Sequence, residues 1–237
     1  MRFSRTEILV GKEGLKKLES AHVLVAGLGG VGSFAVEALA RAGVGHLYII
    51  DYDTVDISNL NRQLFALEST IHMPKIDVAI NRIHDINPSA NVTAIQERLT
   101  VSNCTALLPG SIQYAVDAID EREPKIRLIS ELYNRDTIFI SCMGAARAFD
   151  PLRLRIRDIS KTEYCPLAKR IRKRLKQDGI TRGVTCIYSD EQRSNTKSED
   201  TNDEPRKTLG SLSYMPGIMG LTAASYIIRN ILDQAVD

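Results

Sequence analysis

A glycine-rich turn between two apolar runs limits most strongly what this chain can fold into. The turn reads Gly27-Leu28-Gly29-Gly30-Val31-Gly32-Ser33, and it directly follows a short β-branched run at 22–27. Residues 33–43 then have a helical composition that ends at a glycine, and a second apolar run covers 46–51. A strand, a tight turn, a helix and a strand within about 30 residues are typical of a parallel βαβ unit. The chain is therefore predicted to be an α/β protein.

The alternation of strands and helices continues beyond this unit. The composition predicts helices over 75–85 and 124–134, and strands over 91–95, 114–117, 137–141, 152–157 and 184–188. We expect a Rossmann-like, doubly wound and mainly parallel sheet, with a C-terminal extension of added strands and helices. One domain is predicted over 1–237, with a doubly wound core at 1–145 and a C-terminal part at 146–237.

Three further segments carry expectations of their own. Residues 1–20 are predicted to form an amphipathic arm with Ile8, Leu9, Leu15 and Leu18 on one side. Residues 209–228 carry no charge, but several glycines and Pro216 interrupt them, so a buried helix is favoured over a membrane span. Residues 189–208 contain no large apolar side chain, which predicts a mobile surface loop.

The cysteines and the N-terminus indicate a compartment. The four cysteines, at positions 104, 142, 165 and 186, form no C-x-x-C pair, so a zinc knot with short ligand spacing is excluded. The first residues lack the apolar core of a signal peptide. A cytoplasmic protein with free thiols and no membrane partner is expected.

The glycine turn itself indicates a phosphate site. Glycines allow positive φ and a close approach of backbone to phosphate, and the helix start behind them offers free N–H groups. The alternative is a glycine turn that serves only close packing of strand on helix. Asp51 ends the second strand, about 20 residues after the turn, where a Rossmann carboxylate binds ribose hydroxyls. At this point NAD and ATP fit equally well.

The residues after Asp51 favour ATP. Arg62 and Lys75 place a guanidinium and an ammonium shortly after the phosphate turn. Hydride transfer needs no such cations, whereas nucleotidyl transfer needs them because negative charge develops on the phosphates as pyrophosphate leaves. Asp117 and Asp120 close a later strand at the sheet edge where ligands bind, and a carboxylate there can hold Mg²⁺. For Asp120 the alternative is the N-cap of the following helix.

These motifs resemble a known superfamily. GLGGVGS, DYDTVDISNLNRQ, Lys75 and DAID, in this order, are similar to the ubiquitin-activating-enzyme-like (ThiF-type) adenylating proteins. Downstream, the runs 141–146, 158–162 and 166–169 resemble its tRNA threonylcarbamoyladenosine dehydratase group, whereas the activators of sulfur carriers have zinc-binding C-x-x-C pairs that are absent here.

The resemblance implies a set of site residues. Gly27, Gly29, Gly30 and Gly32 would shape the ATP turn, Asp51 would hold the ribose, Asn59, Arg62 and Lys75 would contact the triphosphate, and Asp120 would support Mg²⁺. Arg5 matches an arginine that some relatives extend across a homodimer into the neighbour's ATP site. Some relatives carry a cysteine near the C-terminus, but none follows Cys186 here. No sulfur relay is therefore transferred, and a sulfur-transfer partner is left open.

The resemblance also implies the reaction. The substrate would be tRNA that carries threonylcarbamoyladenosine, whose threonyl carboxylate is adenylated by ATP and then cyclises with loss of water. Intramolecular ring closure needs no enzymatic nucleophile, so the four cysteines are interpreted as buried apolar residues, with Cys142 the best candidate for an exception.

A basic stretch at 169–176 suits an RNA substrate. It contains six cations, Lys169, Arg170, Arg172, Lys173, Arg174 and Lys176, which on a helix would face the phosphates. Arg153, Arg155 and Arg157 alternate on a nearby predicted strand and would share one face. The alternative for the stretch is a solvated helix surface. Charge reversal at Arg172 and Arg174 is predicted to weaken tRNA binding and its salt dependence.

Three other functions compete with this one. The first is an adenylating activator of a ubiquitin-like or sulfur-carrier protein, and the second is an NAD-dependent dehydrogenase. The third is a non-catalytic RNA-binding scaffold with a relict nucleotide site. The missing zinc pairs and the basic stretch argue against the first, and Arg62 with Lys75 argues against the second.

Overall fold

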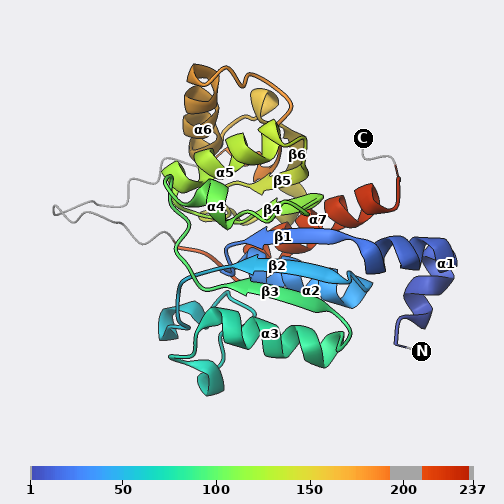
Figure 1. Ribbon diagram of the computed structural model, residues 1–237. Coiled ribbons are helices and arrows are strands. Elements are labelled where there is room, and N and C mark those ends of the chain that lie inside the picture. Colours follow the sequence, from blue (N-terminus) through green and yellow to red (C-terminus); the bar gives the residue numbers. More distant parts are fainter. Residues whose placement is uncertain (1, 193–209, 235–237) are drawn as a thin grey trace.

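A seven-stranded sheet forms the centre of the molecule (Figure 1). This computed structural model describes residues 2–192 and 210–234. In the described chain the strand order is β3-β2-β1-β4-β5-β7-β6, and every neighbouring pair is parallel except β6 with β7. The strands are β1 (His22–Ala26), β2 (His46–Ile50), β3 (Asn91–Ile95), β4 (Tyr114–Asp117), β5 (Ile138–Cys142), β6 (Leu154–Asp158) and β7 (Thr185–Ser189). The predicted doubly wound, mainly parallel sheet with added C-terminal strands is confirmed.

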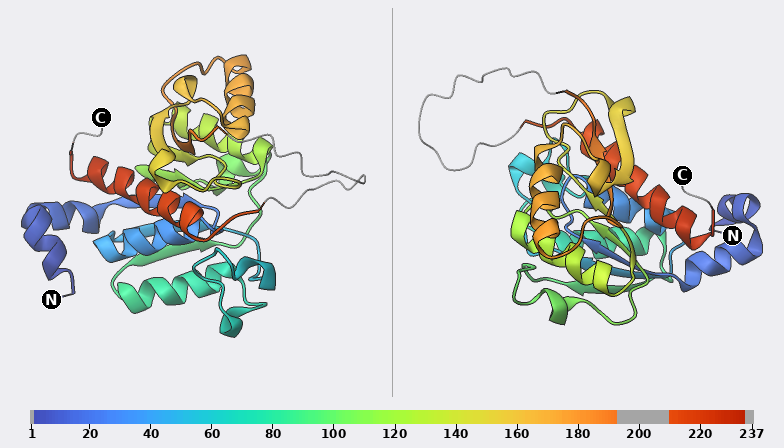
Figure 2. Two further views of the ribbon diagram at one scale, coloured as in Figure 1. Left: turned by 180° about the vertical axis from the view of Figure 1, so that it is seen from behind. Right: turned by 90° about the horizontal axis from the view of Figure 1, so that it is seen from above.

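The helices cover both faces of this sheet. They are α1 (Ser4–Ser20), α2 (Gly32–Ala42), α3 (Lys75–Ile86), α4 (Cys104–Leu107), α5 (Arg122–Asn134), α6 (Pro166–Gln177) and α7 (Tyr214–Ile231). One apolar core lies under α2, α3 and α7, and the other lies under α4, α5 and α6. Figure 2 shows α7 crossing the sheet on the face that also carries α2.

Close packing of α7 on α2 depends on a glycine. A Cβ atom at Gly220 would lie 2.2 Å from the carbonyl oxygen of Val31, so no other residue fits there without a shift of the helices. Met215, Met219, Ala223 and Ile227 of this helix are completely buried. The uncharged segment is thus the predicted buried helix. In 2–192 and 210–234, no helix is long and apolar enough to cross a membrane.

The N-terminal arm differs from its prediction. Gly11 has φ +73°, which breaks the helical path of α1 between its two halves. Leu18 is buried in the core, whereas Ile8 and Leu9 are each 84% exposed. The expected single apolar side is wrong, because the left-handed glycine turns the first half of the arm away from the second.

The loop predicted over 189–208 lies for the most part outside the described residues, from 193 onward. Its first residues are ordered by contacts. Ser189 ends β7, and Asp190 forms ion pairs with Arg153 and Arg155. For Ser189 and Asp190 the prediction of a mobile loop is wrong. Polar contacts, with charged partners for Asp190, replace the apolar contacts that this segment lacks.

Candidate nucleotide site and nucleic-acid interface

The glycine turn connects the carboxyl end of β1 to the start of α2. Gly27 has φ +89°, and a Cβ atom at Gly32 would lie 1.7 Å from the carbonyl oxygen of Gly27. The close packing that formed the alternative interpretation is therefore real. The turn also leaves a helix start behind it whose N-cap is Val31, an apolar side chain that cannot satisfy the first N–H groups. Packing and an anion-binding helix start thus coexist in one turn.

Asp51 connects the end of β2 to this turn. Its carboxylate accepts hydrogen bonds from the backbone N–H of Leu28 at 2.6 Å and of Asp53 at 2.8 Å. Burial raises the pKa of this carboxyl above its ordinary value, although the two backbone donors act in the opposite direction. The side chain that was predicted to bind ribose is therefore held firmly beside the phosphate turn.

Lys75 is fixed by an acidic neighbour that the sequence analysis did not single out. Its ammonium lies 2.9 Å from Oδ2 of Asp53, and its side chain is only 5% exposed. The backbone N–H of Lys75 also donates to the carbonyl oxygen of Asp53 at 3.0 Å. The segment after β2 thus holds the first residue of α3 at the edge of the sheet where the glycine turn lies.

Arg62 lies against the turn. A Cβ atom at Gly30 would come within 3.4 Å of Cγ of Arg62 and within 3.2 Å of Pro216 on α7. The Arg62 guanidinium donates to the carbonyl oxygen of Ser58 and to Oδ1 of Asn61, each at 2.9 Å. The aliphatic part of Arg62 therefore lies beside the glycine turn, and glycine at position 30 makes room for it.

Asn59 is nearly buried one turn earlier and caps its own loop. Its side-chain oxygen accepts a hydrogen bond from the backbone N–H of Asp56 at 3.2 Å, within a capping box around residues 57–59. Its amide nitrogen lies 3.4 Å from Oγ of Ser58. This side chain orders the loop that carries Arg62.

Asp117, the last residue of β4, and Asp120, three residues later, have different surroundings. Asp117 is completely buried, and its carboxylate accepts a hydrogen bond from Oγ of Ser141 at 2.6 Å and pairs with Lys125 at 2.9 Å. Asp120 is exposed. The N-cap of α5 is Glu121, so the alternative interpretation of Asp120 as that N-cap is wrong.

A metal ion in this region would be bound partly by the protein and partly by the phosphates of a nucleotide. Within the described ranges, no three His, Cys, Asp or Glu side chains come together as a set of metal ligands. Mg²⁺ in nucleotide sites is commonly bound by one or two carboxylates together with phosphate oxygens and water. An exposed carboxylate at position 120, on the edge that carries the glycine turn, fits that mode of binding.

Arg5 lies far from this edge within one chain. Helix α1 ends at Ser20, directly before β1 begins, and therefore lies at the amino ends of the parallel strands (Figure 1). The glycine turn follows the carboxyl end of the same strand. Arg5 can therefore reach a nucleotide site only in a second copy of the chain.

Comparison with known proteins agrees with this arrangement. The ThiF family profile matches residues 3–236. This chain belongs to the ThiF family. The chain is 42% identical to tRNA threonylcarbamoyladenosine dehydratase of Bacillus subtilis over 240 residues, which cover 98% of this chain and 94% of the relative. The dehydratase of Escherichia coli is 32% identical, over 99% and 94% of the two chains.

A solved ThiF-type structure confirms the fold. The crystal structure of the Escherichia coli dehydratase TcdA in complex with ATP superposes with a TM-score of 0.90 at 33% identity. The superposition covers 98% of this chain and 94% of that one. The similarity therefore includes the added C-terminal strands and helices as well as the nucleotide-binding core.

The cysteines of this ThiF-family chain are all free and buried. Burial raises the pKa of Cys104 to about 11 and that of Cys142 to about 12, and it raises the pKa of Cys186 further. A thiol needs to form its thiolate to act as a nucleophile, so these three are poorly suited to that role near neutral pH. This includes Cys142, the best candidate of the four.

The basic stretch forms α6, with Ile171 and Leu175 on its buried side. Lys169, Arg170, Lys173 and Lys176 are exposed on the helix. Arg172 differs, because its half-buried guanidinium donates to the carbonyl oxygens of Ile159 and Thr162 and to Oγ1 of Thr162. Arg174 pairs with Asp178. Charge reversal at Arg172 would therefore disturb the fold, and Lys173 and Lys176 provide a cleaner test of RNA binding.

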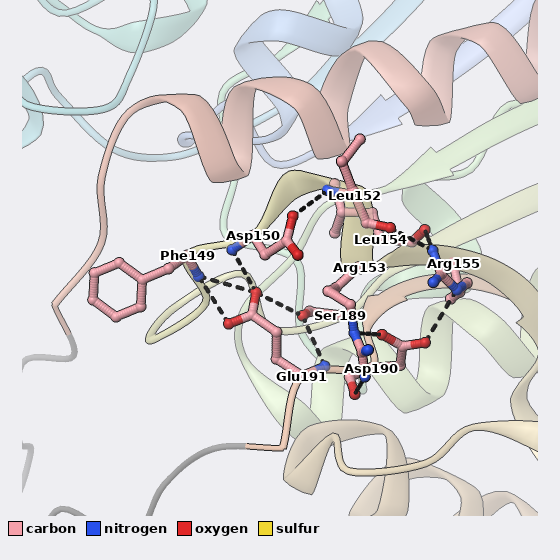
Figure 3. A network of polar contacts seen from close by, with 9 residues as sticks. All are labelled: Phe149, Asp150, Leu152, Arg153, Leu154, Arg155, Ser189, Asp190 and Glu191. Carbon is pink, nitrogen blue, oxygen red and sulfur yellow. Dashed lines mark hydrogen bonds and ion pairs between the residues drawn. The ribbon is translucent and has the colours of Figure 1, made fainter.

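Arg153, directly before β6, and Arg155 on β6 are not both available to RNA (Figure 3). Nε of Arg153 lies 2.6 Å from Asp190, and Nε of Arg155 lies 3.0 Å from the same carboxylate. Beside them, Glu191 accepts hydrogen bonds from the backbone N–H groups of Phe149 and Asp150. Of the three, only Arg157 is exposed without an ion pair to a described residue, because Asp190 holds the other two.

Two residues of this region were missed by the sequence analysis. Lys125 is completely buried beneath the loop after β4, where its ammonium also donates to the carbonyl oxygens of Asp117 and Ile119. A lysine among the apolar positions of a helix was the available signal. Asp53 was quoted within its motif without a role, although its spacing from Asp51 puts both side chains beside the site.

Proposed function

We propose that this protein is an ATP-dependent tRNA-modifying enzyme. It adenylates the threonyl carboxylate of threonylcarbamoyladenosine in tRNA and promotes its cyclisation with loss of water. The observation that carries the proposal is the similarity to named dehydratases over 98% of the chain, which extends well beyond the nucleotide-binding part. The single domain proposed over 1–237 combines the core at 1–145 with a tRNA-facing part at 146–237.

The chemistry follows from the residues at the sheet edge. The threonyl carboxylate attacks the α-phosphate of ATP, and pyrophosphate leaves. Arg62, Lys75 and the start of α2 stabilise the negative charge that develops on the phosphates. A nitrogen of the same modification then attacks the acyl-adenylate and loses its proton, and AMP leaves. Because the ring closure is intramolecular, the attacking nitrogen has an effective molarity of about 10⁵ M or more. The reaction therefore needs no enzymatic nucleophile.

Asp120 is the residue that we assign to Mg²⁺. Bound Mg²⁺ would neutralise phosphate charge and orient the leaving pyrophosphate. The support for this assignment is the exposed position of the carboxylate at the edge of the sheet that carries the glycine turn. Asp117 is excluded from it by burial and by its pairing with Lys125.

We also propose a homodimer in the cytoplasm, with no sulfur-transfer partner assigned. Large apolar side chains are exposed on the arm and beside α7, which is typical of a protein–protein interface. They include Ile8, Leu9, Phe149, Leu152 and Leu221. A second copy would also give Arg5 a nucleotide site to reach. Light scattering of the purified protein is expected to give the mass of a dimer.

The decisive experiment supplies ATP, Mg²⁺ and tRNA that carries threonylcarbamoyladenosine, followed by mass analysis of the nucleosides. The expected product has lost one water, and AMP forms with it in equal amount. Unmodified tRNA is the control and should yield neither. An unchanged nucleoside mass, with a protein that binds ATP, would contradict the dehydratase proposal. ATP–pyrophosphate exchange stimulated by a protein ending in Gly-Gly would instead indicate an activator of a carrier protein.

A further inference from the structure

The side chains of Tyr52, Arg98 and Glu121 meet at the carboxyl edge of the sheet, and none of the three has been assigned a role in binding ATP. Glu121 accepts hydrogen bonds from Nε of Arg98 at 3.1 Å and from Nη2 of Arg98 at 2.8 Å. The hydroxyl of Tyr52 donates to the same oxygen of Glu121 at 3.3 Å. The guanidinium carbon of Arg98 lies 5.2 Å from the centre of the Tyr52 ring, within the range of a cation–π contact.

The position of this trio relates it to the nucleotide residues. Tyr52 directly follows Asp51, and Glu121 directly follows Asp120. Arg98 comes from the loop after β3, where Asn103 holds its backbone carbonyl through a hydrogen bond of 3.0 Å. The trio therefore joins the loops that follow three strands, and two of those loops carry residues assigned to ATP.

The sheet alone does not set the distance between those two loops. In the strand order β3-β2-β1-β4, β2 and β4 both pair with β1 and are not neighbours. Two strand spacings separate them, about 10 Å. The glycine turn emerges from β1, between them. Side-chain contacts from Tyr52 to Glu121 therefore bridge the two loops across the place where the nucleotide is expected.

A contribution to folding stability does not by itself explain why these three side chains come together. The side chains of Arg98 and Glu121 are 51% and 34% exposed, and ion pairs at such positions contribute little to folding. Tyr52 is also 43% exposed, so part of its side chain remains accessible at the edge of the site. An exposed aromatic ring held by a guanidinium and a carboxylate is a preorganised surface for a planar base.

We propose that Tyr52, Arg98 and Glu121 form a clamp that positions the nucleotide. The clamp sets the spacing between the Asp51 loop, which holds the ribose, and the Asp120 loop, and it presents the Tyr52 ring on the base side of the site. All three are proposed as positioning residues, with no role assigned to them at the reacting phosphate. The inference rests on the proposed use of ATP, and not on the identity of the acyl substrate.

Binding of ATP by calorimetry tests the clamp directly. For Arg98→Met and for Glu121→Ala, the Kd of ATP is expected to rise about tenfold, which corresponds to the loss of one well-placed interaction. The double variant should bind no more weakly than either single variant, because both changes open the same clamp. Tyr52→Phe loses its hydroxyl hydrogen bond but keeps the ring under Arg98, which still joins it to Glu121, so it should bind nearly as well as the wild type. Tyr52→Ala should bind as weakly as Arg98→Met.

The matched control is Arg122→Met. This arginine is next to Glu121 and is exposed, but it pairs with Glu123, so its removal should leave the Kd unchanged. In steady-state assays the clamp variants should raise KM for ATP while kcat at saturating ATP stays near the wild-type value. A merely structural role would instead lower the melting temperature and kcat together.

The possible results distinguish the clamp from the proposed dehydratase activity. Wild-type Kd values in both Arg98→Met and Glu121→Ala would overturn the clamp, even in an enzyme that dehydrates its tRNA. Weaker binding in these variants would support the clamp, even if the modified tRNA proved not to be the substrate. A wild-type protein that binds no ATP would overturn both proposals.

Discussion

The ammonium of Lys125 lies 2.9 Å from Oδ2 of Asp117, and both side chains are completely buried. The pair fixes the end of β4 to the first turn of α5. The same lysine donates to the carbonyl oxygen of Ile119, so it also shapes the loop that leads to Asp120. A buried charge pair is therefore part of the framework of the nucleotide site rather than of its chemistry.

Removal of one member of this pair should destabilise the fold strongly. Lys125→Met leaves the Asp117 carboxylate buried without its cation, and the free energy of unfolding is expected to fall by about 3–5 kcal/mol. Urea denaturation measures the change. Arg122→Met on the same helix breaks an exposed pair and should cost less than about 1 kcal/mol. A loss of similar size in the two variants would contradict this interpretation of the buried pair.

Lys75→Met should affect catalysis more than stability. The variant loses the cation that we assign to the phosphates, and its former partner Asp53 is exposed enough to be solvated. Formation of AMP with modified tRNA is expected to slow by about 10²–10³-fold. Lys12→Met, on the exposed side of α1, is the matched control and should react like the wild type. A normal rate in Lys75→Met would remove this residue from the active site.

The exposed side of α6 should determine how tRNA binding depends on salt. Lys173→Glu combined with Lys176→Glu removes two phosphate contacts, so the plot of log K against log salt should become less steep by about 2. Lys12→Glu with Lys16→Glu, on α1 at the amino ends of the strands, makes the same change in charge. Equal salt dependence in the two double variants would exclude α6 from the RNA-binding surface.

Asp190→Asn should have the opposite effect on RNA. The substitution frees the guanidinium groups of Arg153 and Arg155 from their shared carboxylate. Each freed cation that meets a phosphate adds about 0.9 to the salt slope, so tRNA should bind more tightly and with a steeper dependence on salt. Asp77→Asn on α3 changes the net charge equally, at the far edge of the sheet. If both variants gained the same affinity, the effect would be one of net charge alone.

Glu37 should contribute stability that depends on pH. Burial alone would raise the pKa of Glu37, but hydrogen bonds and charge from Arg82 and Arg41 outweigh it, and the pKa lies below the ordinary 4.5. A lowered folded-state pKa means that the stabilisation is complete above the unfolded value and is lost as pH falls through the folded one. The difference in unfolding free energy between wild type and Glu37→Gln should therefore be constant above about pH 4.5 and shrink below it. Urea titrations at several pH values measure it.

The sequence by itself determined the order of the elements and the location of the nucleotide edge. Apolar runs, glycine turns and strand-end aspartates act over a few residues, so their pattern predicted the βαβ unit and the places of Asp51, Lys75 and Asp120. Only the tertiary structure decided which charges are free. It paired Lys75 with Asp53 and Arg153 with Asp190, tied Arg172 to backbone carbonyls, and buried Lys125. Such pairings depend on which loops the fold brings together, because the free energy of a charge depends on its neighbours and its solvent rather than on its position in the chain.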